Sequence, residues 1–259
     1  SKRRPLGQGP PHLYIKLRRD VIMLQEVISQ VNAMVDTARN NTFRYSSKHP
    51  YCVRRYTFGM LKTTTMCHIP DFIFDPREAR MISNAAYLHD VGKLLTPKSL
   101  LNKRGPLTPE EREKMQLHTM DGAMLIYFHP AYKEPLLRKY AFEIALHHHE
   151  RIDGSGYPDG LQGSDLAPWL QVVSIADTFS ALMEKRPYRP AVYIDRAWEM
   201  ILNGDCGQFN DRLLRCLDDD RRWVFGGVSD EIINAAELIW AYENKTEAEK
   251  RAPTDDWPL

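Results

Sequence analysis

The sequence predicts an all-α protein, a helical bundle with a long N-terminal helix and a C-terminal helical extension. Two observations lead to this fold class. Apolar residues recur at spacings of three and four through most of the chain, which is the period of an amphipathic helix. Helix start signals also precede several of these stretches, among them Asp75-Pro76 and Thr108-Pro109.

The composition is that of an ordinary soluble globular protein. Of 259 residues, 43% are hydrophobic and 27% are charged, which is enough for a sizeable core. The net charge of +1 gives no electrostatic reason to expect a DNA or RNA partner. Cys52, Cys67, Cys206 and Cys216 are scattered, as expected for reduced thiols in the cytoplasm. The chain begins at Ser1, so we also consider a fragment of a longer sensor or membrane-anchored protein.

The N-terminal region, residues 1–45, is expected to be a flexible lead-in followed by a linker helix. A helix over residues 12–40 is indicated by a heptad seam of about three repeats. This seam runs through Leu17, Val21, Leu24, Ile28, Val31, Val35 and Ala38. One interpretation is a parallel coiled coil that joins two subunits; the other is a long helix packed on its own domain. Residues 46–217 then form the central domain and residues 218–259 the C-terminal helical extension.

The central domain begins with two predicted helices. His49 precedes a proline that opens a helix over residues 50–68. The next helix is expected over residues 76–91, where Asp75 is the N-cap and Glu78 closes a capping box. His49 alone would be read as a surface turn residue, and it becomes informative only if other ligands lie near it.

The helix over residues 76–91 is expected to end in a cluster of polar residues. His89 and Asp90 are adjacent, so both can reach the same small space from one turn. The two oxygens of an aspartate can bridge two metal ions. Gly92 is expected to end the helix, and Lys93 adds a cation beside the site.

Two further helices carry histidines. Thr108 and Glu111 form a capping box that begins the first of them. On this helix His118 falls on the apolar face, where it is either a ligand or a hydrogen-bonded core histidine. The second helix, over residues 135–150, delivers the consecutive histidines 147–149, which are good ligands for a divalent transition metal.

A glycine-rich loop follows, and then an apolar helix that carries Asp177. A buried carboxylate is costly without a cation, so a metal is the natural partner of Asp177. Arg186 and Arg189 flank Pro187-Tyr188 after this helix. Their charges suit a phosphate or a guanine edge, although a solvated basic turn is the simpler interpretation.

Together these histidines and aspartates predict a two-metal site inside the bundle, with Asp90 bridging the ions. A mixed His/Asp set favours iron, manganese, nickel or zinc over magnesium or calcium. The predicted ligands are His49, His89, Asp90, His118, His148, His149 and Asp177.

The motifs HDVGK, HHE, DGSGYP, IADTFSAL and RPYR, in this order, resemble those of the HD-GYP family of phosphodiesterases. The resemblance implies an HD-type helical bundle and hydrolysis of cyclic di-GMP to pGpG, with GMP as the product of a second cut. It implies two divalent ions, iron or manganese first, and the ligand set given above. Lys93 would contact the scissile phosphate, and Asp90 and Lys93 would be the catalytic pair. Substrate contacts would also come from Gly156, Tyr157, Pro158, Arg186 and Arg189, while His147 would be structural.

The sequence departs from the family at two positions. Tyr45 stands where some members have a glutamate that holds a third metal, so two ions are expected. Ser180 replaces an aspartate that either assists proton transfer or holds a ligand. This leaves open a nucleotide sensor or a docking module for a diguanylate cyclase or sensor domain. A cyclic GMP-AMP dinucleotide is an alternative substrate.

Overall fold

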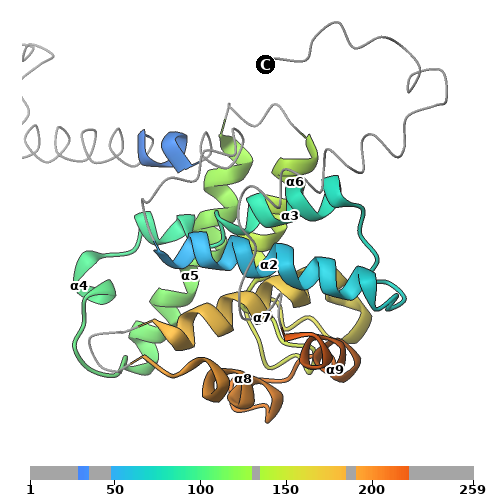
Figure 1. Ribbon diagram of the computed structural model, residues 1–259. Coiled ribbons are helices and arrows are strands. Elements are labelled where there is room, and N and C mark those ends of the chain that lie inside the picture. The colour runs from blue at the N-terminus through green and yellow to red at the C-terminus, as the bar shows by residue number, and fades with distance from the viewer. Residues whose placement is uncertain (1–28, 35–47, 130–134, 185–190, 222–259) are drawn as a thin grey trace, which may run out of the picture.

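The computed structural model describes residues 29–34, 48–129, 135–184 and 191–221, and every regular element in these ranges is helical (Figure 1). The prediction of an all-α fold is therefore confirmed. Most of the N-terminal helix, the C-terminal extension from residue 222, and the positions of Tyr45, Arg186 and Arg189 lie outside these ranges. The α-helices are α2 (Lys48–Met66), α3 (Pro76–Ala86), α4 (Lys98–Leu101), α5 (Pro109–Phe128), α6 (Pro135–His147), α7 (Pro168–Met183), α8 (Ile194–Leu202) and α9 (Asp211–Asp219).

The bundle is built around α7, which lies beside α2 in the middle of the molecule (Figure 1). Its sequence is apolar on nearly all sides, and such a helix belongs in the interior. Phe179 is fully buried and packs edge-on against Trp198 of α8, with the ring centroids 5.7 Å apart. Helix α3 packs on α2, α6 packs on α3, and α5 packs on α6. This arrangement directs residues from five separate segments toward the side of α7 that carries Asp177.

One turn of the N-terminal helix, residues 29–34, is described. Val31, a residue of the predicted heptad seam, is buried and belongs to the core of the central domain. Asn32 and His129 are hydrogen-bonded side chain to side chain. At this turn the seam therefore packs on its own domain rather than being free for a second subunit.

The predicted N-caps are present, with one difference. The capping box of Thr108 and Glu111 is confirmed, because each side chain accepts from the other's backbone N–H, at 3.2 and 2.8 Å. Asp75 caps α3 by accepting from two backbone N–H groups. The capping box predicted for Glu78 is wrong, since its carboxylate accepts from the Tyr140 hydroxyl at 2.7 Å.

The predicted end of the helix over residues 76–91 is also wrong. Helix α3 ends at Ala86, and a turn leads into the short 3-10 helix η1 (Val91–Leu94). Gly92 lies inside η1 rather than terminating a helix. Its role is close packing, because a Cβ there would stand 1.9 Å from the carbonyl oxygen of His118 in α5. The absence of a side chain at Gly92 therefore allows η1 to lie directly against α5.

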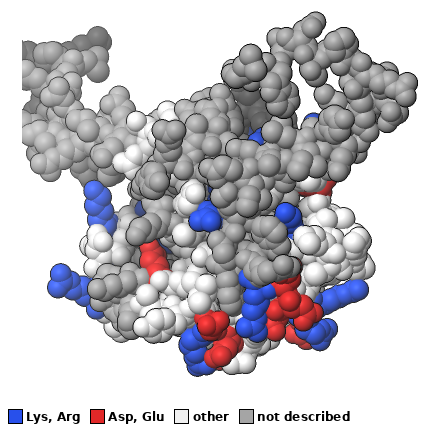
Figure 2. Space-filling model, in the orientation of Figure 1, with Lys and Arg blue, Asp and Glu red and all other residues white. Residues whose placement is uncertain are grey.

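No helix in the described part of the chain is both long and apolar enough to cross a bilayer. On the face drawn in Figure 2, acidic and basic side chains lie next to one another along the edge formed by α8 and α9. Two ion pairs account for part of this mixture, Arg196 with Glu199 and Arg221 with Asp218.

Candidate metal centre

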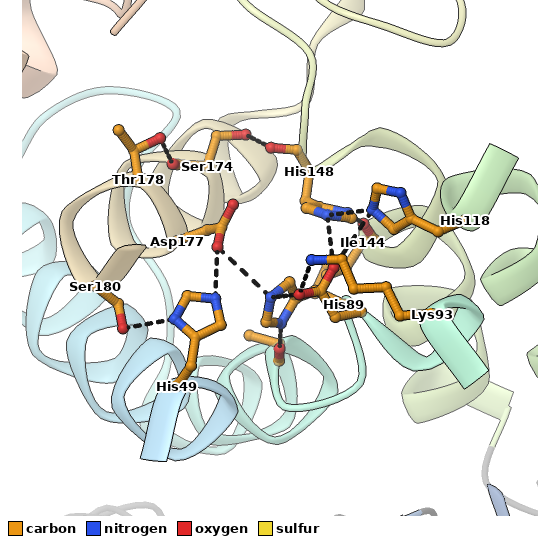
Figure 3. Close-up of polar contacts among 12 residues, drawn as sticks. His49, His89, Lys93, His118, Ile144, His148, Ser174, Asp177, Thr178 and Ser180 are labelled. Atoms are coloured by element: carbon orange, nitrogen blue, oxygen red, sulfur yellow. Dashed lines mark hydrogen bonds and ion pairs between the residues drawn. The ribbon is translucent and has the colours of Figure 1, made fainter. Parts of the chain in front are cut away.

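Seven histidine and aspartate side chains converge in two neighbouring groups. Figure 3 labels His49, His89 and Asp177 of one group and His118 and His148 of the other. Within each group the ligand atoms lie within 4.8 Å of one another. They come from the first turn of α2, the turn between α3 and η1, α5, the turn after α6, and α7. The structure thus brings together every residue that the sequence nominated as a metal ligand. The first group is His49, His89 and Asp177, and the second group is Asp90, His118, His148 and His149.

Asp90 lies between the two groups. Its Oδ1 is 3.3 Å from His118 Nε2 and 3.7 Å from His148 Nε2, in the second group. Its Oδ2 is 3.2 Å from His89 Nε2, in the first group, and 2.6 Å from Lys93 Nζ. Because each oxygen faces a different group, the carboxylate has the geometry of a bridging ligand.

Backbone carbonyls set the orientation of three imidazoles. His89, His118 and His148 each donate from Nδ1 to a carbonyl oxygen three or four residues earlier, at 2.9, 2.6 and 2.9 Å. A carbonyl can only accept, so Nδ1 carries the hydrogen and Nε2 presents a lone pair to the centre. Two such lone pairs, on His118 and His148, face each other at 3.5 Å. Hydrogen bonds that fix the ring in this way are typical of metal-ligating histidines.

His49 is oriented by a side chain instead. Its Nε2 is 3.0 Å from Asp177 Oδ1, and its Nδ1 is 2.9 Å from Ser180 Oγ, one turn further along α7 (Figure 3). When Nε2 serves as a ligand, Nδ1 carries the hydrogen and donates to Ser180. Ser180 therefore lies where the side chain of residue 180 can hold the ligand His49 in place.

The centre fits a divalent cation. His89 Nε2 and Asp90 Oδ1 are buried without a hydrogen bond to any described residue, which is costly unless an ion satisfies them. Burial opposes ionisation of Asp90, but Lys93 and the histidines outweigh it and hold its pKa well below the ordinary value. Burial lowers the pKa of His148 to about 4. Ionised carboxylates and neutral imidazoles are the forms in which these groups bind metals.

His147 has a different environment from its two neighbours. Its Nδ1 is 3.1 Å from Glu143 Oε2 and its Nε2 is 2.9 Å from Asp159 Oδ2. With both nitrogens bound to carboxylates, the ring links α6 to the loop that follows. It belongs to neither ligand group.

The loop over residues 153–163 forms one wall of the centre. The Tyr157 ring stacks on His149, with centroids 4.6 Å apart and an interplanar angle of 26°. Gly156 is required by packing, since a Cβ would lie 2.4 Å from the Cα of Glu150. Pro158 follows Tyr157 through a cis peptide bond. The predicted loop residues thus lie beside the ligands.

Glu150 is a functional residue to which the sequence analysis gave no role. Its side chain is fully buried, and its two oxygens accept from the backbone N–H groups of residues 159, 160 and 161, at 2.7 to 3.0 Å. The carboxylate thereby fixes the loop that carries Tyr157. The available signal was a glutamate placed directly before a glycine-rich turn, whose N–H groups need acceptors.

Both ligand groups open into one cleft of about 780 Å³. Its wall includes Lys93 and Tyr157 at the centre, and Arg151, Thr178 and Cys206 along one side. Arg186 and Arg189, predicted to contact a nucleotide, lie outside the described residues. A cleft of this size holds a ligand larger than a single phosphate group.

Comparisons with known proteins identify relatives of known activity. The profile of the HD domain family matches residues 48–206. The chain is 42% identical to the cyclic di-GMP phosphodiesterase response regulator RpfG of Xanthomonas campestris pv. campestris (strain 8004), over 46% of this chain and 31% of that protein. It is 31% identical to a cyclic di-GMP phosphodiesterase of Vibrio cholerae, over 76% of this chain and 38% of that protein. It is also 39% identical to the 3'3'-cGAMP-specific phosphodiesterase 2 of Vibrio cholerae, over 54% of this chain and 26% of that protein.

A solved structure supports the fold. Bd1817, an HDG"Y"P protein from Bdellovibrio bacteriovorus, superposes with a TM-score of 0.52 at 20% identity, over 76% of this chain and 61% of that chain. The three relatives named above are much longer proteins, and the matched part is only 26% to 38% of their length. The family profile nevertheless spans well over half of this chain and includes every ligand of the candidate centre. The chain therefore belongs to the HD domain family and carries the ordered motifs of its HD-GYP branch.

Proposed function

We propose that this protein is a metal-dependent phosphodiesterase that hydrolyses cyclic di-GMP to pGpG, with GMP as the product of a second cut. The observation that carries the proposal is the position of Asp90. Its carboxylate lies between two groups of ligands, with Lys93 on the same oxygen that faces the first group. This is the arrangement expected of a two-metal phosphodiester hydrolase, and the named activities of the relatives agree with it.

We further propose two divalent transition-metal ions, iron or manganese first and nickel or zinc after them. The first ion would be held by His49, His89 and Asp177, and the second by His118, His148 and His149, with Asp90 shared. The mixture of imidazole and carboxylate ligands supports these metals. Tyr45, in place of a carboxylate, supports two ions rather than three.

When bound, divalent ions in such a centre polarise the phosphodiester and make a water acidic enough to attack it. The residues of this chain contribute positioning and charge. Lys93 lies at the cleft with its ammonium group beside Asp90, where it would stabilise the charge that develops on the phosphoryl oxygens. Tyr157 holds the His149 ring and excludes water from one side. Burial raises the pKa of Tyr157, so its hydroxyl stays protonated and can donate to the substrate. Arg186 and Arg189 would bind the nucleotide.

A cyclic GMP-AMP dinucleotide is the second candidate substrate. It is favoured by the 39% identity to a 3'3'-cGAMP-specific phosphodiesterase. Both substrates have the same phosphodiester linkages around the ring, so the metal chemistry would be common to both.

Three features of the wider assembly remain proposals. We expect a homodimer formed through the N-terminal helix, although the buried Val31 competes with that role. A diguanylate cyclase or a sensor domain would be a protein partner. A cytoplasmic location would place the enzyme with its substrate.

The experiment that tests the function is anaerobic turnover of both dinucleotides after loading with iron or manganese, with products resolved by chromatography. We expect pGpG to appear with wild type, and no product with His89→Ala. Tight dinucleotide binding by fully loaded wild type without any product would contradict the proposal and favour a sensor.

A further inference from the structure

Arg151 lies on the wall of the cleft, directly after the loop-anchoring Glu150, and neither the motifs nor the relatives assign it a role. Its guanidinium is held from three sides. Nε donates to the Cys206 carbonyl at 3.1 Å, Nη1 to the Glu150 carbonyl at 2.9 Å, and Nη2 to Thr178 Oγ1 at 3.3 Å. The group also lies over the Phe209 ring, 4.9 Å from its centroid. A long side chain is thereby fixed in one conformation.

The surroundings are shaped to receive this side chain. Gly207 has a φ of +97°, and a Cβ at that position would lie 2.7 Å from Arg151 Nε. A residue with a side chain would be both strained and in collision with the guanidinium. The loop between α8 and α9 therefore leaves space for Arg151. This loop lies against the loop after α6, because the Ile152 N–H donates to the Gln208 carbonyl.

The charge of Arg151 is not neutralised by these contacts. All three hydrogen-bond acceptors are uncharged oxygens, two of them carbonyls and one a hydroxyl. A guanidinium has five N–H groups, so two are left for a ligand. The carboxylates of Asp177 and Asp153 act on this cation through space, without a hydrogen bond to it. A partly buried cation gains further when an anion bonds to it directly. Because Arg151 lines the cleft, that anion can come from the bound substrate.

We propose that Arg151 binds the phosphate of the cyclic dinucleotide that is not being cleaved, an inference that rests on the proposed function. A cyclic dinucleotide carries two phosphates. The metal centre and Lys93 of η1 would bind the phosphate that is cleaved. Arg151 provides a second cation in the lining of the same cleft, next to Thr178 of α7. An arginine with two N–H groups in one plane matches a phosphate better than a lysine does.

The test compares Arg151→Gln and Arg151→Lys with wild type. Binding of cyclic di-GMP is measured by calorimetry on metal-free protein, where no turnover competes, and KM and kcat are measured on metal-loaded protein. We expect the Kd and KM to rise about 10- to 100-fold in Arg151→Gln with little change in kcat, as for loss of a charged hydrogen bond used equally in both states. The Kd and KM of Arg151→Lys should lie between those of wild type and Arg151→Gln. Arg196→Gln, an exposed arginine on α8, is the matched control and should change nothing.

A second substrate separates binding from damage to the centre. Bis(p-nitrophenyl) phosphate has one phosphodiester and no second phosphate, so its rate should stay within about twofold in every variant. An equal loss for this substrate would show that Arg151 only supports the fold, and would overturn the inference. If Arg151→Gln does not fold, Arg151→Lys decides by the same comparison.

The remaining outcomes are distinct. Equal losses for cyclic di-GMP and cyclic GMP-AMP support a phosphate contact, whereas a changed ratio between them would mean a guanine contact and overturn it. If wild type binds the dinucleotide without turnover and Arg151→Gln binds it weakly, the proposed function fails and the role of Arg151 stands. If wild type turns it over and Arg151→Gln binds it equally well, the role of Arg151 fails alone.

Discussion

Replacing Ser180 with alanine should weaken the binding of one metal ion and leave the other unaffected. Ser180 Oγ is the acceptor for His49 Nδ1 at 2.9 Å, and His49 belongs only to the first ligand group. Ser180→Ala removes that acceptor without adding bulk. The His49 side chain is only 11% exposed, so water cannot easily replace the lost partner.

The size of the effect follows from this one hydrogen bond. Losing a hydrogen-bond partner of a ligand typically costs 10- to 100-fold in metal affinity, or about 1.4 to 2.8 kcal/mol. That range agrees with the roughly 1 to 3 kcal/mol for leaving a buried donor unsatisfied. Ser180→Asp should act in the opposite direction, because a carboxylate acceptor makes a bond about twice as strong and increases the basicity of the imidazole. We expect this variant to bind the first ion more tightly and to turn over faster at equal metal loading.

The assay is anaerobic titration with a chelator of graded affinity, followed by metal analysis. Wild type should release two equivalents, and Ser180→Ala should release one of them at a lower chelator concentration. Ser83→Ala is the control, because the Ser83 hydroxyl is equally buried but bonds only to the Arg80 carbonyl within α3. Unchanged affinity for both ions in Ser180→Ala, or an equal loss of both, would refute the reasoning.

Four further predictions concern the loop and the consecutive histidines. His147→Ala should keep both metals while His148→Ala loses metal; the reverse result by elemental analysis would shift the ligand assignment by one residue. Glu150→Gln should keep metal but lower turnover by at least about tenfold, because the amide nitrogen cannot accept a hydrogen bond from a loop N–H. Gly156→Ala should lower the unfolding temperature by several degrees, because the added Cβ would collide with the backbone of Glu150. The free energy of unfolding of the metal-free protein should fall as the pH drops from 6.5 to 4, because burial lowers the pKa of His148 to about 4 and the unfolded chain takes up the proton first. Urea titrations should show that this residue contributes a loss of about 3 kcal/mol over that range. If His148→Ala has the same dependence of unfolding free energy on pH as wild type, the prediction is contradicted.

Local patterns predicted most of what the structure shows. The Thr108 cap and the buried face of α7 depend on neighbours within a turn or two, so the sequence alone contains the information. The convergence of the ligands could be predicted because buried aspartates and histidines need partners. The packing of Gly92 against the His118 carbonyl could not be predicted, since it joins η1 to another helix.

The remaining gaps have the same cause. Glu150 acts through backbone N–H groups of residues 159–161 in the adjacent loop, and Arg151 acts through the backbone carbonyl of residue 206, which is distant in the sequence. No periodicity or spacing marks such a partner. Helix α8 was likewise not expected, although its fully buried Trp198 packs against α7.

The spread of the ligands along the chain has a consequence for biosynthesis. A polypeptide leaves the ribosome N-terminus first. The second ligand group is complete once residue 149 has been made, whereas the first pairs His49 with Asp177, 128 positions later. A nascent chain that stops before α7 would therefore contain every ligand of the second group, while His49 and His89 of the first group would still lack Asp177. Capture of an ion by the first group would then join the first and last helices that contribute ligands, so metal supply would influence the last step of maturation.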